Sequence, residues 1–508
     1  MIEFKQNYVC ENDTTLINKI YIKSEENFFN DMETYNNEVK NILQNNNNIV
    51  IFGTFPGCGK SWATQLCSKK ALYVTPFNRL CQSLIIKGHQ SITLHNLMAL
   101  NITGESSKRK NYDVSEFDTI VFEEIMMYSP QLLSSIHRFM KLHTDKKIIA
   151  NGDVSQNLPI LFNLNNVSDE EQYLMHCINS MFNNQIILTV NKRMKNETDR
   201  IILKCLKDDI FNLNINVIEI FKKYKFNIIN NIDLLETTKN ISYFRSRAFK
   251  INKCVQDKLS IDKKFSEYTY ECNNKKYTYK YYVGQQILCK NTFKRKHAKC
   301  FTNYKYEIVR ITPNTKKIYL ITIKNIYDDT TMLITYNQLK YMTLIYASTS
   351  HSNQGITIEE PYTIFDSNIV YCDRRWLWTS LTRSTKLSDS TIFEHSKKEC
   401  GILEKCKYKQ YFDLKINGYI QQDILAGRIK KINNKLYFRN KVIKDYVDYD
   451  FINKQQDFKC HICGDIFDFD IIDGKVHSNF TIDRIDNTIF HSKNNCKLAC
   501  CHCNVSKK

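Results

Sequence analysis

The chain has 508 residues, which is too many for one hydrophobic core, so several domains are expected. Its 72 Lys and Arg residues exceed its 53 Asp and Glu residues, and the formal charge of +19 favours a polyanionic partner such as nucleic acid. The charged N-terminus MIEFKQNYVCEND predicts no signal peptide, and no apolar run is long enough to span a membrane. We therefore expect an intracellular, reducing location, in which most of the 19 cysteines stay free thiols.

The first half of the chain changes pattern near residue 49. Residues 1–48 read as a polar helical segment that ends in the asparagine run before residue 49. In residues 49–185, short apolar strands alternate with helical patterns, and this alternation predicts a parallel sheet flanked by helices. The predicted strands are Ile49–Phe52, Leu72–Thr75, Thr119–Phe122 and Lys147–Asn151.

A second alternating pattern, in residues 186–395, predicts another parallel-sheet domain. Its predicted strands are Ile186–Val190, Ile241–Phe244, Tyr346–Ser348 and Tyr362–Asp366. Segments rich in Tyr, Thr and Lys interrupt it from about 265 to 340 and predict a small antiparallel β insert. Residues 396–455 read as a basic connector, and residues 456–508 read as a compact module rich in Cys and His.

The run FGTFPGCGKS (Phe52–Ser61) lies between a predicted strand and a predicted helix, the context of a phosphate-binding loop. Its glycines let backbone N–H groups turn towards phosphates, and the helix N-terminus adds positive potential. Lys60 would reach the β- and γ-phosphates of ATP, and Ser61 would ligate Mg²⁺. Thr54 replaces the first glycine of the usual GxxxxGK[ST] pattern, and a plain glycine-rich turn is the alternative. The predicted ATP-binding residues here are Thr54, Gly57, Cys58, Gly59, Lys60 and Ser61.

Two acids end the apolar strand that precedes residue 125. Glu123 would hold Mg²⁺ through water, and Glu124 would orient the attacking water. The usual pair is Asp-Glu, so the carboxylate of Glu123 lies one methylene further out. The alternative is a strand that ends in two solvated acids.

Further motifs follow in a fixed order. They are TPFNRL (75–80), TLHNL (93–97), GDVSQNLP (152–159), NKR (191–193), TSHSNQGIT (349–357) and TSLTR (379–383). Together with the phosphate-binding loop and the acidic pair, they resemble the motifs of superfamily 1 helicases over residues 50–390. The resemblance implies an α/β fold with two RecA-like domains that hydrolyse ATP with Mg²⁺ and move along single-stranded nucleic acid.

The resemblance also implies a role for individual residues. Gln156 would sense the γ-phosphate, and Arg193 and Arg383 would act as arginine fingers from the second domain. Gln354 and Gly355 would bind the nucleotide. The residues expected to contact a single strand are Thr75, Asn78, His95, Thr349, His351 and Thr357.

Two branches of superfamily 1 fit these motifs. TSHSNQG and VGQQILCKN with a following β insert look most like the 5′-to-3′ DNA branch, which includes the exonuclease V α-subunit and phage recombination helicases. The viral RNA-helicase-like branch shares the GxPGxGKS element. DNA is the favoured partner, as a single strand or a fork, and no membrane partner is expected.

Two CxxC pairs mark the C-terminal module. Cys460, Cys463, Cys500 and Cys503 predict a tetrahedral Cys₄ site for a structural Zn²⁺. A module of this size also needs a structural metal or a similar cross-link to fold.

The segment between and after the pairs resembles zinc-containing HNH nucleases of the ββα type. Asp483, Asn495 and Asn504 match residues that serve catalysis there, and the resemblance implies a second Mg²⁺ or Mn²⁺. Arg484 stands where the general base is expected, and a guanidinium cannot accept a proton. His491 and His477 are the candidate substitutes, so the module either cuts DNA or grips it.

The sequence as a whole predicts an ATP-dependent motor fused to a zinc-stapled HNH-like module, a fusion that suits a large DNA virus or a mobile element. Two alternatives stay open. One is a mobile-element nuclease with a decayed motor, and the other is a nucleic-acid-binding protein without catalysis.

Overall fold

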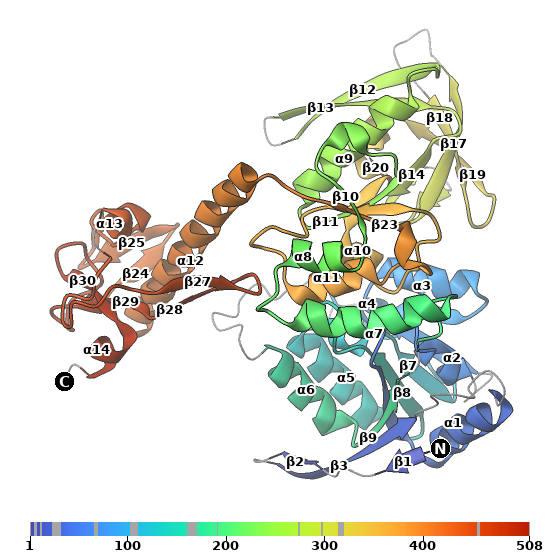
Figure 1. The fold of residues 1–508 in the computed structure, drawn as a ribbon, viewed down its shortest axis with the longest axis horizontal. Helices are drawn as coiled ribbons and strands as arrows, with labels where there is room; N and C mark the ends of the chain where they lie inside the picture. The colour runs from blue at the N-terminus through green and yellow to red at the C-terminus, as the bar shows by residue number, and fades with distance from the viewer. Residues whose placement is uncertain are drawn as a thin grey trace.

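The computed structural model describes residues 2–4, 8–10, 13–22, 32–65, 70–101, 110–159, 170–189, 191–272, 275–295, 298–312, 320–454 and 458–506, with those before residue 39 as backbone alone. Two parallel-sheet domains lie one on the other, an antiparallel β insert extends from the second, and the C-terminal module lies to one side (Figure 1). The predicted α/β fold class is confirmed. In the part of the chain that the structure describes, every helix is too short or too polar to cross a bilayer.

The first domain is built on a nine-stranded sheet with the order β1-β3-β9-β4-β8-β7-β5-β6, in which β2 pairs with β3. Strands β3 to β6 in this order run parallel, and the central ones are buried on both faces, which explains their continuous apolar runs. The strands are β1 (Ile2–Phe4), β2 (Tyr8–Cys10), β3 (Asp13–Ile22), β4 (Asn48–Gly53), β5 (Ala71–Thr75), β6 (Gln90–Thr93), β7 (Thr119–Phe122), β8 (Lys147–Gly152) and β9 (Asn184–Leu188). The helices are α1 (Met32–Asn45), α2 (Lys60–Gln65), α3 (Asn78–Ile86), α4 (Leu94–Leu97), η1 (Ile125–Met127), α5 (Pro130–Leu142) and α6 (Glu170–Met181).

Two predictions about this domain are wrong. The predicted N-terminal helical segment is helical only over Met32–Asn45 among its described residues, since Ile2–Phe4, Tyr8–Cys10 and Asp13–Ile22 form strands and β3 extends the first sheet by pairing in parallel with β9. The predicted strand Ile186–Val190 also belongs to the first sheet, where β9 lies between β3 and β4, although Val190 itself is outside the described residues. The first domain therefore starts before residue 48 and includes β9. The apolar pattern of β9 identifies a strand, but it does not identify the sheet that the strand joins.

The second domain contains an all-parallel sheet with the order β10-β23-β22-β11-β21. Its strands are β10 (Asn227–Ile229), β11 (Lys239–Ser242), β21 (Ala347–Thr349), β22 (Tyr362–Ile364) and β23 (Ser390–Phe393). Its helices are α7 (Glu197–Phe211), α8 (Val217–Lys223), η3 (Ile232–Leu234), α9 (Arg245–Leu259), α10 (Ser350–Asn353), α11 (Arg374–Leu381) and η5 (Leu387–Asp389). Helix α11 is buried along most of its length and carries Trp376 and Trp378 into the core.

The β insert separates β11 and α9 from β21. A five-stranded antiparallel sheet with the order β19-β18-β17-β14-β20 forms its body, and two hairpins flank it. The strands are β12 (Phe265–Cys272), β13 (Lys275–Tyr282), β14 (Gln286–Cys289), β15 (Phe293–Arg295), β16 (Ala298–Cys300), β17 (Lys305–Thr312), β18 (Leu320–Asn325), β19 (Thr331–Thr335) and β20 (Met342–Leu344), with η4 (Tyr336–Tyr341) before β20. Alternating buried and half-exposed residues in β18 show that one face packs on the core.

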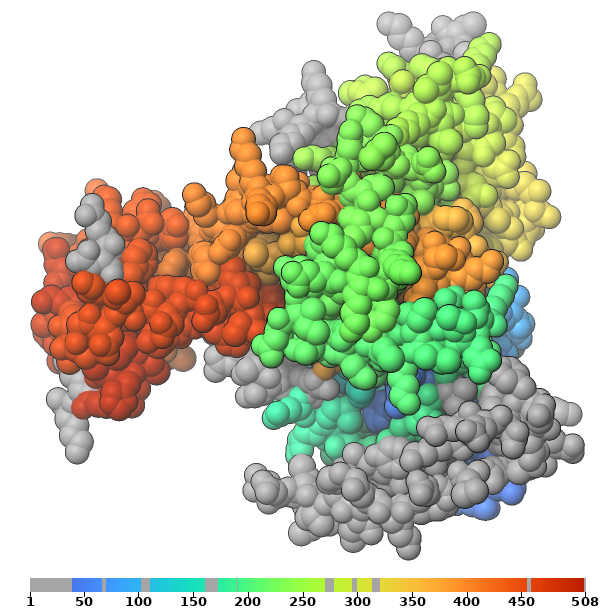
Figure 2. Space-filling view, viewed as in Figure 1, coloured from blue at the N-terminus to red at the C-terminus, as the bar shows by residue number. Residues whose placement is uncertain are grey.

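The C-terminal module is larger than predicted, and it forms a lobe beside the second domain (Figure 2). The supposed connector is the 29-residue helix α12 (Lys397–Leu425) followed by a three-stranded sheet. Phe412 and Ile416 of α12 share one core with Phe480 and Leu498 of the Cys/His-rich part, so the module starts inside α12. The remaining elements are β24 (Lys430–Ile432), β25 (Lys435–Phe438), β26 (Lys441–Val442), α13 (Tyr449–Asn453), β27 (Phe469–Ile472), β28 (Lys475–Ser478), β29 (Phe480–Arg484), β30 (Cys496–Cys500) and α14 (Cys501–Ser506).

Candidate functional site

The phosphate-binding loop joins the end of β4 to α2. Gly57 and Gly59 have φ angles of +84° and +83°, a backbone region that favours glycine. A Cβ on Gly57 would lie 2.4 Å from the Cβ of Arg193, so the second domain's first residues pack directly on this loop. Thr54, by contrast, does not have a positive φ, and its hydroxyl donates to the carbonyl oxygen of Leu188 at 3.3 Å. A glycine is therefore not required at residue 54.

The two acids after β7 lie in different surroundings. Glu123 is buried and accepts hydrogen bonds from Ser61 Oγ at 3.2 Å and from Asn151 Nδ2 at 2.9 Å. Burial and the neighbouring Glu124 raise the pKa of Glu123 to about 7. The two predicted Mg²⁺ residues, Ser61 and Glu123, thus already meet, and a bound cation would favour the ionised form of Glu123.

Glu124 has a left-handed backbone with φ of +52°, which turns it away from the strand direction. Its Oε2 accepts a hydrogen bond from Gln354 Nε2 of the second domain at 3.2 Å. Gln354 is fully buried, whereas Gly355 has φ of +77° and packs against Leu80. The acid predicted to orient water is therefore linked to the second domain.

Asp153 connects Lys60 to Gln156. Lys60 Nζ lies 3.9 Å from Asp153 Oδ2, and the same oxygen accepts a hydrogen bond from Gln156 Nε2 at 2.9 Å. The side chains of Asp153 and Gln156 are almost completely buried, whereas Lys60 is half-buried. Asp153 was not among the predicted site residues, although it belongs to the GDxxQ motif.

Both predicted arginine fingers reach this site from the second domain. Arg383, which follows α11, donates through Nη2 to Gln156 Oε1 at 3.2 Å and through Nε to the carbonyl oxygen of Thr379 at 2.7 Å. Arg193 Nη1 donates to the carbonyl oxygen of Thr382 at 2.7 Å. Burial lowers the pKa of both arginines, and Arg193 contributes to the value of about 10 for Arg383. Both stay charged at neutral pH.

Three interdomain contacts were not predicted from the sequence. Arg79 Nη1 donates to the carbonyl oxygen of Ser352 at 2.8 Å, and Asn157 Nδ2 donates to Ser350 Oγ at 3.1 Å. Lys207 of α7 donates to the carbonyl oxygen of Thr54 at 2.5 Å. Arg79 and Asn157 lie inside recognised motifs, which was a usable signal. Lys207 lies on a helix without a motif, so the sequence contained no signal for it.

The residues predicted to contact nucleic acid divide by exposure. Asn78 and Thr357 are exposed, while His95, Thr349 and His351 are half-buried. Burial lowers the pKa of both histidines, so they are neutral at physiological pH. Thr75 is fully buried and donates to the carbonyl oxygen of Phe77, which leaves only its backbone for a nucleic-acid contact.

This arrangement of domains has counterparts among solved structures. A Pif1 helicase, whose structure concerns DNA unwinding at forked double-stranded DNA, matches with a TM-score of 0.50 and 16% identity over 72% of this chain and 93% of its own. The chain shares the fold of the Pif1 helicases. Bacteroides Pif1 bound to single-stranded DNA has a TM-score of 0.49 and 15% identity over 74% of this chain and 97% of its own. Pif1 from Candida albicans has a TM-score of 0.48 and 12% identity over 73% of this chain and 98% of its own. Neither a protein-family model nor a curated protein matches the sequence.

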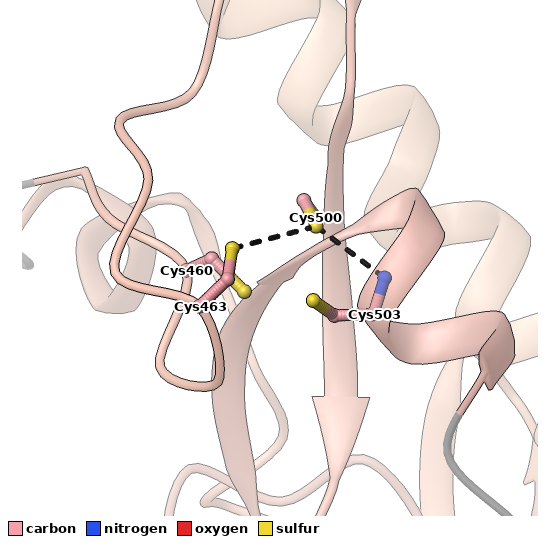
Figure 3. A group of neighbouring side chains, drawn as sticks. All are labelled: Cys460, Cys463, Cys500 and Cys503. Carbon is pink, nitrogen blue, oxygen red and sulfur yellow. Dashed lines mark hydrogen bonds between the residues drawn. The ribbon is translucent and has the colours of Figure 1, made fainter.

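The four predicted zinc cysteines come together between a loop and the β30–α14 junction (Figure 3). Their sulfur atoms all lie within 4.8 Å of one another, and Cys463 and Cys500 are 3.9 Å apart. Tetrahedral Zn–S bonds of about 2.3 Å would place the sulfurs about 3.8 Å apart. The donor set therefore fits a closed structural zinc site.

The predicted nuclease residues lie on β29, β30 and α14 but do not converge as expected. Asp483 is buried, and its Oδ2 lies 2.8 Å from Nε2 of His461, which stands inside the first CxxC pair. Asn504 Nδ2 donates to Thr481 Oγ1 at 2.7 Å, next to Asp483 on β29. Asn495 instead closes the preceding loop, since its amide accepts from Asp486 N and donates to Asp486 O. The prediction that Asn495 binds an ion is therefore not supported by its geometry.

A buried carboxylate on α12 explains Arg484 and His491. Asp423 is fully buried and accepts hydrogen bonds from Tyr446 Oη at 2.9 Å and from the backbone N–H of His491 at 2.8 Å. His491 Nδ1 lies 2.8 Å from the same Asp423 oxygen, and Arg484 Nη1 lies 3.4 Å from the other. Both side chains are thus occupied in the core of the module. The histidine that contacts Asp483 in space is instead His461.

Proposed function

We propose that this chain is an ATP-dependent helicase or translocase on single-stranded DNA, with a C-terminal zinc module that cuts or clamps DNA. One observation supports the motor: the residues predicted to serve ATP hydrolysis lie close together where two domains meet. The first domain supplies Lys60, Ser61 and the two acids, and the second supplies Arg193 and Arg383.

Each group has a separate task in phosphoryl transfer. Lys60 would leave Asp153 for the β- and γ-phosphates, and Ser61 and Glu123 would hold Mg²⁺, which neutralises phosphate charge when bound. Glu124 would orient the attacking water, and Arg193 and Arg383 would stabilise charge that develops in the transition state. Because Gln354 bonds Glu124 and Arg383 bonds Gln156, the occupancy of the ATP site is linked to the approach of the two domains.

DNA is the proposed partner for two reasons. The Pif1 helicase of the same fold is described as unwinding forked double-stranded DNA. Residues 428–444 also contain seven basic residues and no acid, and six of the seven are exposed on β24–β26 and its turns. They are Lys430, Lys431, Lys435, Arg439, Lys441 and Lys444, with Arg428 bonded to Asp423. Such a surface suits phosphate contacts of the DNA backbone.

The test is ATP hydrolysis by the full chain, with and without single-stranded DNA or RNA, followed by unwinding of a forked duplex. We expect DNA to stimulate hydrolysis and Lys60→Ala to lower turnover by orders of magnitude without changing the melting temperature. The absence of hydrolysis with every nucleic acid would refute the motor and favour the decayed-motor or binding-protein alternatives. Stimulation by RNA alone would refute the choice of DNA.

A second activity, cleavage of DNA, is favoured by the Asp483–His461 pair. We propose that Asp483 and Asn504 hold a Mg²⁺ or Mn²⁺ ion, to which their oxygen atoms are suited, and that His461 positions Asp483 and the attacking water. His461→Ala should remove nicking in Mn²⁺, whereas His477→Ala, on the exposed face of β28, should not. If the zinc-loaded protein does not nick DNA, the module is a clamp. The zinc thiolates also suit the intracellular, reducing location that we propose.

A further inference from the structure

The C-terminal module touches the second domain at the tip of the β27–β28 hairpin, in addition to its covalent link through α12 (Figure 1). Asp473 and Gly474 form this tip, with φ angles of +48° and +74°. Asp473 Oδ1 accepts a hydrogen bond from the backbone N–H of Arg374 at 2.6 Å. A Cβ on Gly474 would lie 3.0 Å from the carbonyl oxygen of Tyr371, so the two backbones approach too closely for a larger residue.

The hairpin therefore caps the N-terminus of α11. The first N–H groups of a helix lack partners inside the helix. Asp373 accepts one from Trp376 at 2.6 Å, and Asp473 accepts another from Arg374. Burial raises the pKa of Asp373 to about 6, and the nearby Asp473 carboxylate adds to this increase. Two carboxylates are thus held at one helix end despite their repulsion, which indicates that the helix N-terminus holds both.

The other end of α11 holds the two arginines of the ATP site. The carbonyl oxygen of Thr379 accepts from Arg383 Nε, and that of Thr382 accepts from Arg193 Nη1. The helix is only eight residues long, and Trp376 to Leu381 are all buried. A short helix in a close-packed core moves as one body, so a shift at its N-terminus also displaces these carbonyl oxygens.

Helix α12 reinforces the same contact. Lys407 of α12 lies with its Nζ 4.7 Å from the ring centre of Tyr371, whose carbonyl oxygen is the group next to Gly474. The loop before α11 is consequently held from two sides by the C-terminal module.

We propose that the Asp473–Gly474 tip is a positioning element for α11, so that the docked C-terminal module promotes ATP hydrolysis by holding Arg193 and Arg383 in place. Asp473 acts through the helix and does not touch the nucleotide. A DNA substrate that displaces the module would therefore weaken ATP hydrolysis. The inference rests on the proposed ATPase function.

The test compares full-length variants in steady-state ATP hydrolysis with single-stranded DNA. Asp473→Ala removes the acceptor, Asp473→Asn keeps an acceptor oxygen, and Asp470→Ala removes an exposed carboxylate elsewhere on the same hairpin. We expect Asp473→Ala to lower kcat roughly threefold to tenfold with an unchanged KM for ATP, as changes along coupled elements do. Asp473→Asn and Asp470→Ala should keep the wild-type kcat.

Thermal melting and a second substitution, Gly474→Ala, distinguish positioning from folding. Gly474→Ala should lower kcat in the same way while the melting temperature stays close to that of the wild type. A wild-type kcat in both Asp473→Ala and Gly474→Ala would overturn the inference, as would an equal loss in Asp470→Ala. An inactive wild-type protein would instead refute the proposed function itself.

Discussion

Arg383 offers the sharpest test of the nucleotide site, because its side chain is almost completely buried and bonds to Gln156 of the first domain. Arg383 Nη2 lies 3.2 Å from Oε1 of Gln156, the residue predicted to sense the γ-phosphate, so we expect the guanidinium to form a close ion pair with charge that develops there, for which we take a separation of about 4 Å. At an effective dielectric constant of about 20, one unit charge at that distance contributes about 4 kcal/mol. Arg383→Ala should therefore reduce kcat roughly 1,000-fold.

The assay measures kcat and KM for ATP with single-stranded DNA, together with the affinity for a non-hydrolysable ATP analogue. The analogue affinity should change by less than about tenfold, because the arginine mainly stabilises the transition state. Lys386→Ala is the matched control, since it removes an exposed positive charge three residues later. An equal loss in affinity and in kcat would show that Arg383 binds the ground state. A loss of less than about tenfold in kcat would refute its role as a finger.

Four further substitutions test the acids and the C-terminal module. Glu124→Gln should abolish hydrolysis and spare ATP binding, while Glu123→Gln should raise the Mg²⁺ concentration needed for half-maximal rate. Cys460→Ser should expose the module to proteases and remove zinc from metal analysis, because zinc binding supplies much of the folding free energy of such modules. Asp423→Ala should lower the unfolding free energy of the module by roughly 3–5 kcal/mol, since it removes the carboxylate that buried His491 and half-buried Arg484 contact. Burial raises the pKa of Asp423, but the hydrogen bonds from His491 outweigh this effect and lower the pKa below its usual value. The stabilisation is therefore complete above about pH 4 and is lost as the pH falls below that value. Acid unfolding of the wild type and of Asp423→Ala would measure this loss.

Several features followed from the sequence because they depend on local chemistry. A phosphate-binding loop needs glycines, Lys60 and Ser61 at set positions, and a Cys₄ site needs two close pairs of cysteines, so short spacings predicted both. The order of the motifs likewise predicted two RecA-like domains, and the observed fold agrees. The roles assigned to individual residues stay predictions until the variants are measured.

Other features depend on which distant segments meet, and periodicity does not encode that. The sequence pattern showed a strand at β9 but not that it joins the first sheet, and it missed the strand nature of residues 13–22. It read α12 and β24–β26 as a connector, because the apolar residues that pack them against the Cys/His-rich part are far apart in the chain.

The same reason explains the side chains that only the tertiary structure placed. His461 meets Asp483 across 22 residues, and Asp423 meets His491 across 68. Asp473 meets the start of α11 across 99 residues. The sequence by itself determined the chemistry that each short motif can perform. The tertiary structure decided which motifs act together, because hydrogen bonds and close packing join residues by their position in space and not by their distance along the chain.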